Sequence, residues 1–209
     1  MEMSKVFAKR VIPAVVIDQA ELALPLAETL LKAGMNVIEV TFRTAAAADA
    51  IRAIAMRFPE MAVGAGTLLS ADQVRQAADA GSVFGVAPGL SEVVLHTAQE
   101  RGMLMVPGVA TASEITRGLE LGCRILKFFS AESSGGESAL KALAGAFGHT
   151  GVRFLPTGGI HAGNMADYLA LPVVAGIGGS WMVEKKLIAA RDWKQIEALT
   201  REALAMAGV

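Results

Sequence analysis

Eight short apolar runs of β-strand character, each followed by a segment of helical character, constrain the fold of this chain more than any other feature. The runs recur roughly every 20 to 30 residues. They are apolar throughout, which is typical of parallel strands that are covered on both faces. The expected strands are 11–17, 36–42, 62–67, 83–88, 103–109, 125–130, 152–156 and 173–177. This pattern predicts an α/β protein with a parallel sheet.

The segments between the runs carry the start and stop signals of helices. We expect Asp18, Ser70 and Ser91 to cap helices at their beginning, and glycines such as Gly34 to end them. The expected helices are 19–33, 44–58, 70–80, 91–101, 111–121, 137–147, 162–169 and 192–207.

Eight strand–helix units predict a (β/α)8 (TIM) barrel. Residues 1–209 would form a single barrel domain of compact size, because about 200 residues is the lower end for this fold. A doubly wound open sheet is the alternative. That fold usually needs fewer units and has a G-x-G-x-x-G motif after its first strand, which this sequence lacks.

Composition and charge exclude several classes of protein. A net charge of −1 argues against nucleic-acid binding. The single cysteine, Cys123, cannot form an internal disulfide and is expected to pack, which fits a reducing compartment. Residues 1–10 do not resemble a signal peptide, and Pro172 interrupts the long uncharged stretch 168–183. We therefore expect a soluble, cytoplasmic protein that binds neither nucleic acid nor membrane.

The expected strand 125–130 is unusual because Lys127 lies in the middle of an apolar run. Burying an unpaired ammonium group is costly, so this lysine must find a partner, reach a wet cavity or become neutral. A neutral lysine in a cavity is a nucleophile towards carbonyl groups. The alternative is that Lys127 lies at a strand end and extends its amine to solvent.

The expected strand 36–42 carries polar residues on one face. Glu39, Thr41 and Arg43 are two residues apart, with apolar residues between them that can pack against outer helices. Glu39 could then shuttle protons, and Arg43 could bind a carboxylate or phosphate. A buried structural ion pair is the alternative. If Lys127 and Phe129 also face inward, burial and Arg43 would lower the lysine pKa, while Glu39 would oppose them.

Small and hydroxyl-bearing residues lie at the carboxyl ends of three other expected strands. Thr67 ends the third strand, where it would place a hydroxyl at the barrel mouth. The glycine-rich ends 156–159 and 176–180 follow strands seven and eight, where a phosphate site recurs in this fold. Glycines also serve ordinary turns, but glycine pairs after both strands favour a phosphate site.

Other reactive side chains are weaker candidates. His96, His149 and His161 lie far apart without metal-ligand spacing, so we expect no metal site. Glu132 follows the lysine strand, but we do not place it among the site residues. The charge run 184–186 is expected to form a solvated turn.

At these residues the chain resembles the 2-keto-3-deoxy-6-phosphogluconate (KDPG) aldolases, which often also cleave 4-hydroxy-2-oxoglutarate (KHG). One such block would not be specific, but six in the right order cover nearly the whole chain. The blocks are Glu-Val-Thr-Phe-Arg-Thr at 39–44, Val-Gly-Ala-Gly-Thr at 63–67, Ala-Pro-Gly-Leu at 87–90, Lys-Phe-Phe at 127–129, Pro-Thr-Gly-Gly at 156–159 and Gly-Gly-Ser-Trp at 178–181.

The resemblance implies a class I aldolase that forms its Schiff base at Lys127 and uses Glu39 as general acid and base. It would cleave KDPG to pyruvate and glyceraldehyde 3-phosphate, and KHG to pyruvate and glyoxylate. It also implies a homotrimer that needs no metal or cofactor. The implied substrate-binding residues are Arg43, Thr67, Pro88 and Thr157 around the pyruvate portion, Phe129 beside the imine, and Gly158, Gly159, Gly179 and Ser180 at the distal phosphate.

The chain departs from the family pattern at two positions. Ser130 stands where many relatives have proline, and Val16 stands where the 2-dehydro-3-deoxy-6-phosphogalactonate aldolases have arginine. We therefore rank the galactonate activity below the gluconate activity. A sugar-phosphate isomerase or epimerase, and a non-catalytic phosphate-binding barrel, are further alternatives.

Overall fold

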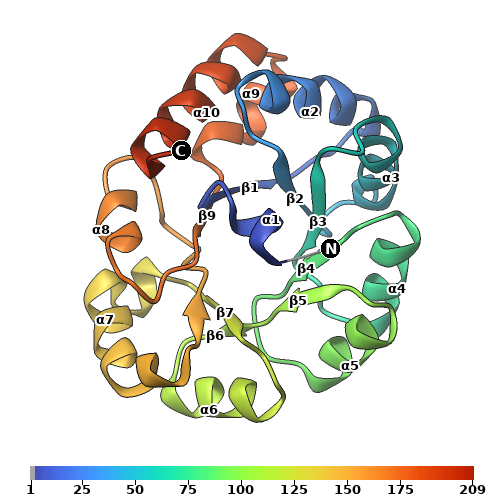
Figure 1. The fold of residues 1–209 in the computed structure, drawn as a ribbon. Coiled ribbons are helices and arrows are strands. Elements are labelled where there is room, and N and C mark those ends of the chain that lie inside the picture. The colour runs from blue at the N-terminus through green and yellow to red at the C-terminus, as the bar shows by residue number, and fades with distance from the viewer. Residues whose placement is uncertain (1–2) are drawn as a thin grey trace.

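The described part of this protein, residues 3–209 of a computed structural model, has parallel strands at its centre and helices around them (Figure 1). All ladders between named strands are parallel. The strands are β1 (Val11–Val15), β2 (Val37–Thr41), β3 (Ala62–Gly66), β4 (Phe84–Val86), β5 (Leu104–Val106), β6 (Gly108–Val109), β7 (Ile125–Phe128), β8 (Arg153–Phe154) and β9 (Ile177–Gly179).

The strands form two sheets that together close into a (β/α)8 barrel, as predicted. The larger sheet has the order β5-β4-β3-β2-β1-β9, and the smaller has the order β6-β7-β8. At one seam the chain continues from β5 into β6. At the other seam, isolated bridges join Phe154 to Val174 and Thr157 to Gly178.

Several expected strands, such as 83–88 and 152–156, are shorter than predicted, and two others differ in continuity or position. The expected strand 103–109 is divided into β5 and β6 at Pro107, which has no N–H to donate to a ladder. The last strand was expected at 173–177 but lies at Ile177–Gly179. Its position follows from its pairing with β1, in which Val11 is opposite Ile177 and Pro13 is opposite Gly179.

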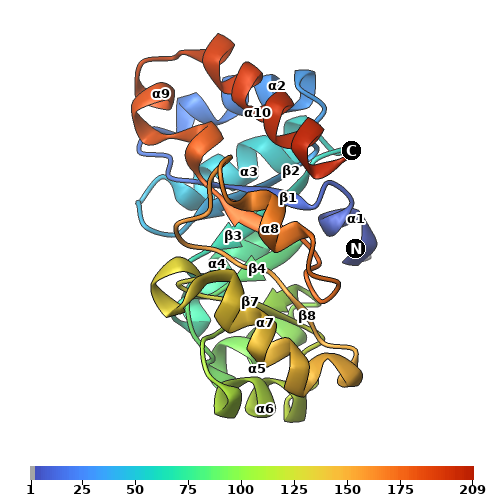
Figure 2. The ribbon, with the colours of Figure 1, turned by 90° about the vertical axis from the view of Figure 1, so that its left-hand side faces the viewer.

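Helices cover the outside of the barrel, as the views along and across its axis show (Figures 1 and 2). Helix α1 lies across one end, next to the start of β1. The helices are α1 (Met3–Phe7), α2 (Ala23–Lys32), α3 (Ala47–Arg57), α4 (Ala71–Asp79), α5 (Glu92–Glu100), α6 (Ala112–Glu120), α7 (Gly136–Phe147), α8 (Met165–Leu169), α9 (Lys185–Ala189) and α10 (Trp193–Ala207), with 3₁₀ helices at Ala20–Leu22, Glu132–Ser134, Gly148–Thr150 and Trp181–Val183.

The helix starts confirm most of the expected caps. The hydroxyls of Ser70 and Ser91 accept hydrogen bonds from the first turns of α4 and α5. The prediction for Asp18 was wrong, because no side chain caps the helix that follows it. Asp18 instead forms an ion pair with Lys185 Nζ at 2.8 Å. The run 184–186 is also not a simple turn, since α9 begins at Lys185.

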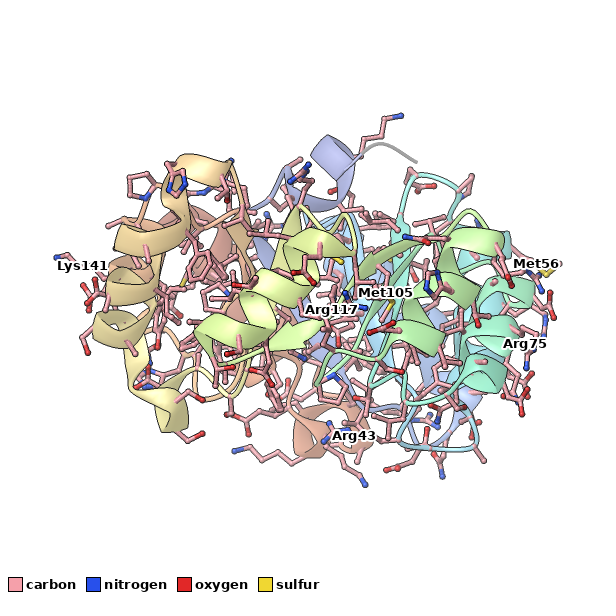
Figure 3. All side chains as sticks on the ribbon, turned by 90° about the horizontal axis from the view of Figure 1, so that it is seen from below. Arg43, Met56, Arg75, Met105, Arg117 and Lys141 are labelled. Atoms are coloured by element: carbon pink, nitrogen blue, oxygen red, sulfur yellow. The ribbon has the colours of Figure 1, made fainter. Side chains whose placement is uncertain are left out.

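Four polar side chains on the strands or just after them are buried: Glu39, Thr41, Lys127 and Thr157. In a parallel barrel the carboxyl ends of the strands meet at one end. Arg43, just after β2, lies at the end opposite α1 (Figure 3).

No helix within residues 3–209 is long and apolar enough to cross a lipid bilayer.

Candidate functional site

A cavity of about 330 Å³ at the carboxyl ends of the strands brings together all the site residues predicted from the sequence. They come from β2, β7 and β9 and from the segments after β2, β3, β4, β7, β8 and β9. The predicted residues that line it are Glu39, Arg43, Thr67, Pro88, Lys127, Phe129, Thr157, Gly158, Gly159, Gly179 and Ser180.

Four further residues line the same cavity: Ala14, Thr41, Ile160 and Gly178. Thr41 was expected to face inward with Glu39 but was not proposed as a site residue. Ala14, Ile160 and Gly178 carry no reactive group, so their chemistry gave no signal. Strand pairing could have identified Ala14, because it is directly opposite Glu39 in the β1–β2 ladder.

Lys127 is buried, which excludes the alternative that its amine extends to solvent. Its side chain lies on β7, the residue is 6% exposed, and its Nζ is 4.6 Å from the centroid of the Phe129 ring. Burial lowers the pKa of Lys127, and Arg43 lowers it further, whereas the negative charge of Glu39 opposes both. The amine is therefore easier to deprotonate than an exposed lysine.

Glu39 faces the same cavity from β2 and is only 2% exposed. Burial raises the pKa of Glu39, although the positive charges of Lys127 and Arg43 oppose this. Its Oε2 has no hydrogen-bond partner among the described residues. The carboxylate has room because Gly66 has no side chain, and a methyl group there would overlap it.

A structural ion pair between Glu39 and Arg43 is also excluded, because no ion pair within residues 3–209 includes either residue. Arg43 Nε donates a long hydrogen bond of 3.4 Å to the Thr41 hydroxyl. That hydroxyl donates to the Val15 carbonyl at 2.8 Å. The carboxyl group and the guanidinium are therefore both left for other partners in the cavity.

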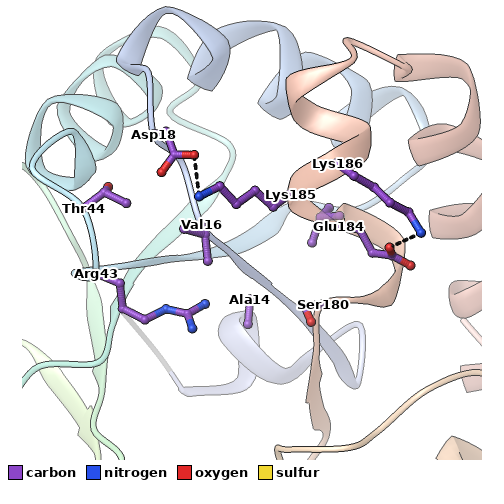
Figure 4. A pocket seen from close by; sticks show the side chains of 10 residues that line it. Ala14, Val16, Asp18, Arg43, Thr44, Ser180, Glu184, Lys185 and Lys186 are labelled. Atoms are coloured by element: carbon purple, nitrogen blue, oxygen red, sulfur yellow. Dashed lines mark ion pairs between the residues drawn. The ribbon is translucent and has the colours of Figure 1, made fainter.

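Arg43 stands between this cavity and an adjoining one of about 570 Å³. Its guanidinium points towards the space between it and Ser180 (Figure 4). Ala14 and Ser180 also line both cavities. An anionic group that enters through the adjoining 570 Å³ cavity would thus pass Arg43 before it reached Lys127.

The segment 157–159 after β8 forms a glycine turn at the edge of the cavity. Gly158 has φ +102° and Gly159 has φ +78°, values that L side chains rarely adopt. The segment after β7 holds this turn, because Glu132 N donates to the Gly158 carbonyl at 3.1 Å. Neither Gly158 N–H nor Gly159 N–H donates a hydrogen bond to a backbone carbonyl within residues 3–209. Both remain available for a ligand.

Thr67 has a left-handed backbone conformation, with φ +57°. Such a conformation is unfavourable for a β-branched residue and persists only where the surrounding structure enforces it. Strained residues of this kind are concentrated at functional sites, and Thr67 lines the cavity.

The other reactive residues considered in the sequence are not among those that line the cavity. Glu132 accepts a hydrogen bond from the buried Tyr168 hydroxyl. His96, His149 and His161 are exposed. Burial raises the pKa of the Cys123 thiol. Within the described residues, no group of three or more His, Cys, Asp or Glu side chains could hold a metal ion.

The chain is similar to known proteins over most of its length. The family described as "KDPG and KHG aldolase" matches residues 3–199. The "KHG/KDPG aldolase" of Escherichia coli strain K12 is 46% identical over 194 residues, which cover 93% of this chain and 90% of the relative.

Two solved structures are similar over nearly their whole length. A KDPG aldolase from Legionella pneumophila, with pyruvate captured as a covalent carbinolamine, has a TM-score of 0.92 and 40% identity, and covers 96% of this chain and 97% of its own. The KDPG aldolase of Zymomonas mobilis with 3-phosphoglycerate has a TM-score of 0.89 and 40% identity. The match covers 98% of this chain and 97% of that chain. The chain belongs to the KDPG and KHG aldolase family.

Proposed function

We propose that the protein is a class I aldolase that cleaves KDPG to pyruvate and glyceraldehyde 3-phosphate, and KHG to pyruvate and glyoxylate. One observation carries this proposal: a buried lysine with a lowered pKa, Lys127, shares a cavity with a buried carboxyl group without a partner, Glu39. The covalent pyruvate carbinolamine in the Legionella relative is the type of intermediate that such a lysine forms.

The reaction begins when the neutral amine of Lys127 attacks the keto carbon of the substrate. The carbinolamine loses water and becomes an iminium ion. Loss of the proton from the C4 hydroxyl then breaks the C3–C4 bond, and the electron pair moves towards the iminium nitrogen. The aldehyde leaves and an enamine of pyruvate remains, so one difficult step becomes several easier ones.

Glu39 is placed to move the protons that these steps require. Its raised pKa brings the carboxyl group nearer to neutral pH, where it can both accept and donate a proton. In our proposal it removes the proton from the C4 hydroxyl, protonates the enamine carbon and assists the gain and loss of water at the carbinolamine. Hydrolysis of the resulting imine releases pyruvate and restores Lys127.

The remaining cavity residues would hold the two ends of the substrate. We assign Arg43, Thr67, Pro88 and Thr157 to the pyruvate portion and place Phe129 beside the imine. Gly158, Gly159, Gly179 and Ser180 are assigned to the distal phosphate. The free N–H groups of the glycine turn support the phosphate assignment. Holding both ends fixes the reacting carbons relative to Lys127 and Glu39.

Trapping with pyruvate and borohydride tests the reaction type. Reduction of the Schiff base should give a stable adduct that peptide mass mapping places on Lys127. Absence of an adduct, or labelling of exposed lysines alone, would contradict the aldolase and leave an isomerase, epimerase or non-catalytic phosphate-binding barrel.

Ser180→Ala tests the phosphate assignment. Because one hydrogen bond to a charged group is lost, we expect the KM for KDPG to rise about tenfold, with little change for KHG, which has no phosphate. Ser113→Ala, an exposed position on α6, serves as the matched control. An equal loss for both substrates would show that Ser180 does not contact the phosphate.

We also propose that the enzyme is a cytoplasmic homotrimer, as the family resemblance implies. Exposed apolar side chains such as Met56, Leu69 and Val93 offer contact surface for other subunits. The unpaired, buried Cys123 is compatible with a reducing compartment. Light scattering coupled to gel filtration tests the trimer, and a monomeric mass would contradict it.

A further inference from the structure

A second cavity, of about 410 Å³, lies at the other end of the barrel and is lined by Arg10, Arg124 and Arg153. We refer to it as the arginine pocket. Arg10 immediately precedes β1, Arg124 precedes β7, and Arg153 is the first residue of β8. All three therefore lie at the amino ends of parallel strands, whereas the proposed active site is at the carboxyl ends. The other lining residues are Phe7, Ile125, Gly151 and Ala175.

Two of the three arginines are fixed in place by backbone carbonyl groups. Arg10 Nη2 donates to the Leu169 carbonyl at 2.6 Å, and Arg153 Nη2 donates to the Val174 carbonyl at 3.0 Å. Each bond orients the guanidinium but does not neutralise its charge. The remaining N–H groups can serve a ligand, since a guanidinium carries five donors.

The positive charges in the arginine pocket are not balanced by carboxylates of the described chain. No ion pair within residues 3–209 includes Arg10, Arg124 or Arg153. Exposed arginines elsewhere, such as Arg75 and Arg117, do have carboxylate partners. Three like charges around one cavity repel one another, so an anion bound there would relieve that repulsion.

We propose that the arginine pocket binds a small polyanion with two or more phosphate or carboxylate groups. Guanidinium groups match the geometry of both kinds of oxyanion and bind them through paired hydrogen bonds. The apolar side chains of Phe7 and Ile125 reduce the local polarity, which strengthens these interactions. A volume of about 410 Å³ suits a small metabolite rather than a single ion.

The position of the pocket indicates what such a ligand does to the protein. Arg10 adjoins the six-stranded sheet, whereas Arg124 adjoins the three-stranded sheet and Arg153 belongs to it. Only isolated bridges join β8 to the segment of β9 within the described residues. A polyanion that contacts arginines on both sides would connect the two sheets. Because it binds the folded state, it stabilises the protein against unfolding.

Thermal unfolding and calorimetric titration of the full chain test this site, with inorganic pyrophosphate and citrate as probes. We expect at least one probe to bind and to raise Tm, and the tighter one identifies phosphate or carboxylate as the preferred group. Binding should weaken about 10- to 100-fold in Arg124→Gln/Arg153→Gln. It should remain in the control Arg52→Gln/Arg75→Gln, whose arginines lie on exposed helix surfaces.

Additional variants distinguish binding in the arginine pocket from binding elsewhere on the protein. Pyrophosphate could also enter the proposed active site, so the rise in Tm should persist in Ser180→Ala. If the double variant does not fold, Arg124→Gln alone replaces it, and trapping of pyruvate at Lys127 reports an intact barrel. The proposal would be overturned if the double variant bound the probes as tightly as the wild type, or if neither probe bound. It would also be overturned if the control variant lost as much probe affinity as the double variant. A change in oligomer mass on mutation would overturn it as well, because it would assign the arginines to a contact between copies.

Discussion

Lys127→Met should abolish cleavage of both KDPG and KHG, with a loss of roughly 10⁴-fold or more in kcat. The change removes the amine that forms the Schiff base and leaves an unbranched side chain of similar length. Because Lys127 is buried in the barrel, methionine fills its space without burying a charge, and the fold should be retained. Steady-state kinetics with both substrates measure the loss.

The matched control is Lys141→Met, which removes an exposed lysine from α7. This variant should keep full activity and should still form the adduct with pyruvate and borohydride. Lys127→Met should form none. Adduct formation at the wild-type level in Lys127→Met, or substantial remaining cleavage, would place the nucleophile on another residue.

The sequence predicted those parts of the site that depend on local signals. An ionisable residue inside an apolar run is anomalous wherever the run packs, and this singled out Lys127, although its run alone left two orientations open. The apolar residues that alternate with Glu39 placed that carboxyl group inside the barrel. The alternation of β2 placed Thr41 and Arg43 on the same side as Glu39. Ser70 was identifiable because a helix cap depends only on its immediate neighbours.

Features that depend on barrel closure could not be predicted in the same way. The extent of β9 is determined by its register with β1, which lies at the far end of the sequence. The division of the fifth strand at Pro107 reflects the need for β5 and β6 to pair with different neighbours. The arginine pocket could not be predicted either. An arginine at the start of a strand is common, and only the closed barrel brings the three arginines together.

Glu39→Gln should lower kcat for cleavage by about 10²–10⁴-fold, because the amide keeps the shape of the side chain but cannot transfer protons. Lys127 remains, so pyruvate should still be trapped by borohydride, but more slowly. The control is Glu100→Gln at the exposed end of α5, which should behave as wild type.

The pH dependence of this variant gives a second, independent test. In the wild type, kcat/KM should rise with pH as Lys127 loses its proton, at a pH below that of an exposed lysine, because burial lowers its pKa. The negative charge of Glu39 opposes this shift. Removal of this charge in Glu39→Gln should lower the pKa of Lys127 further. The rise of kcat/KM with pH should then occur at lower pH than in the wild type. A rise that stays in place or moves to higher pH would show that the two groups are not electrostatically coupled, and hence that they do not share one cavity as described.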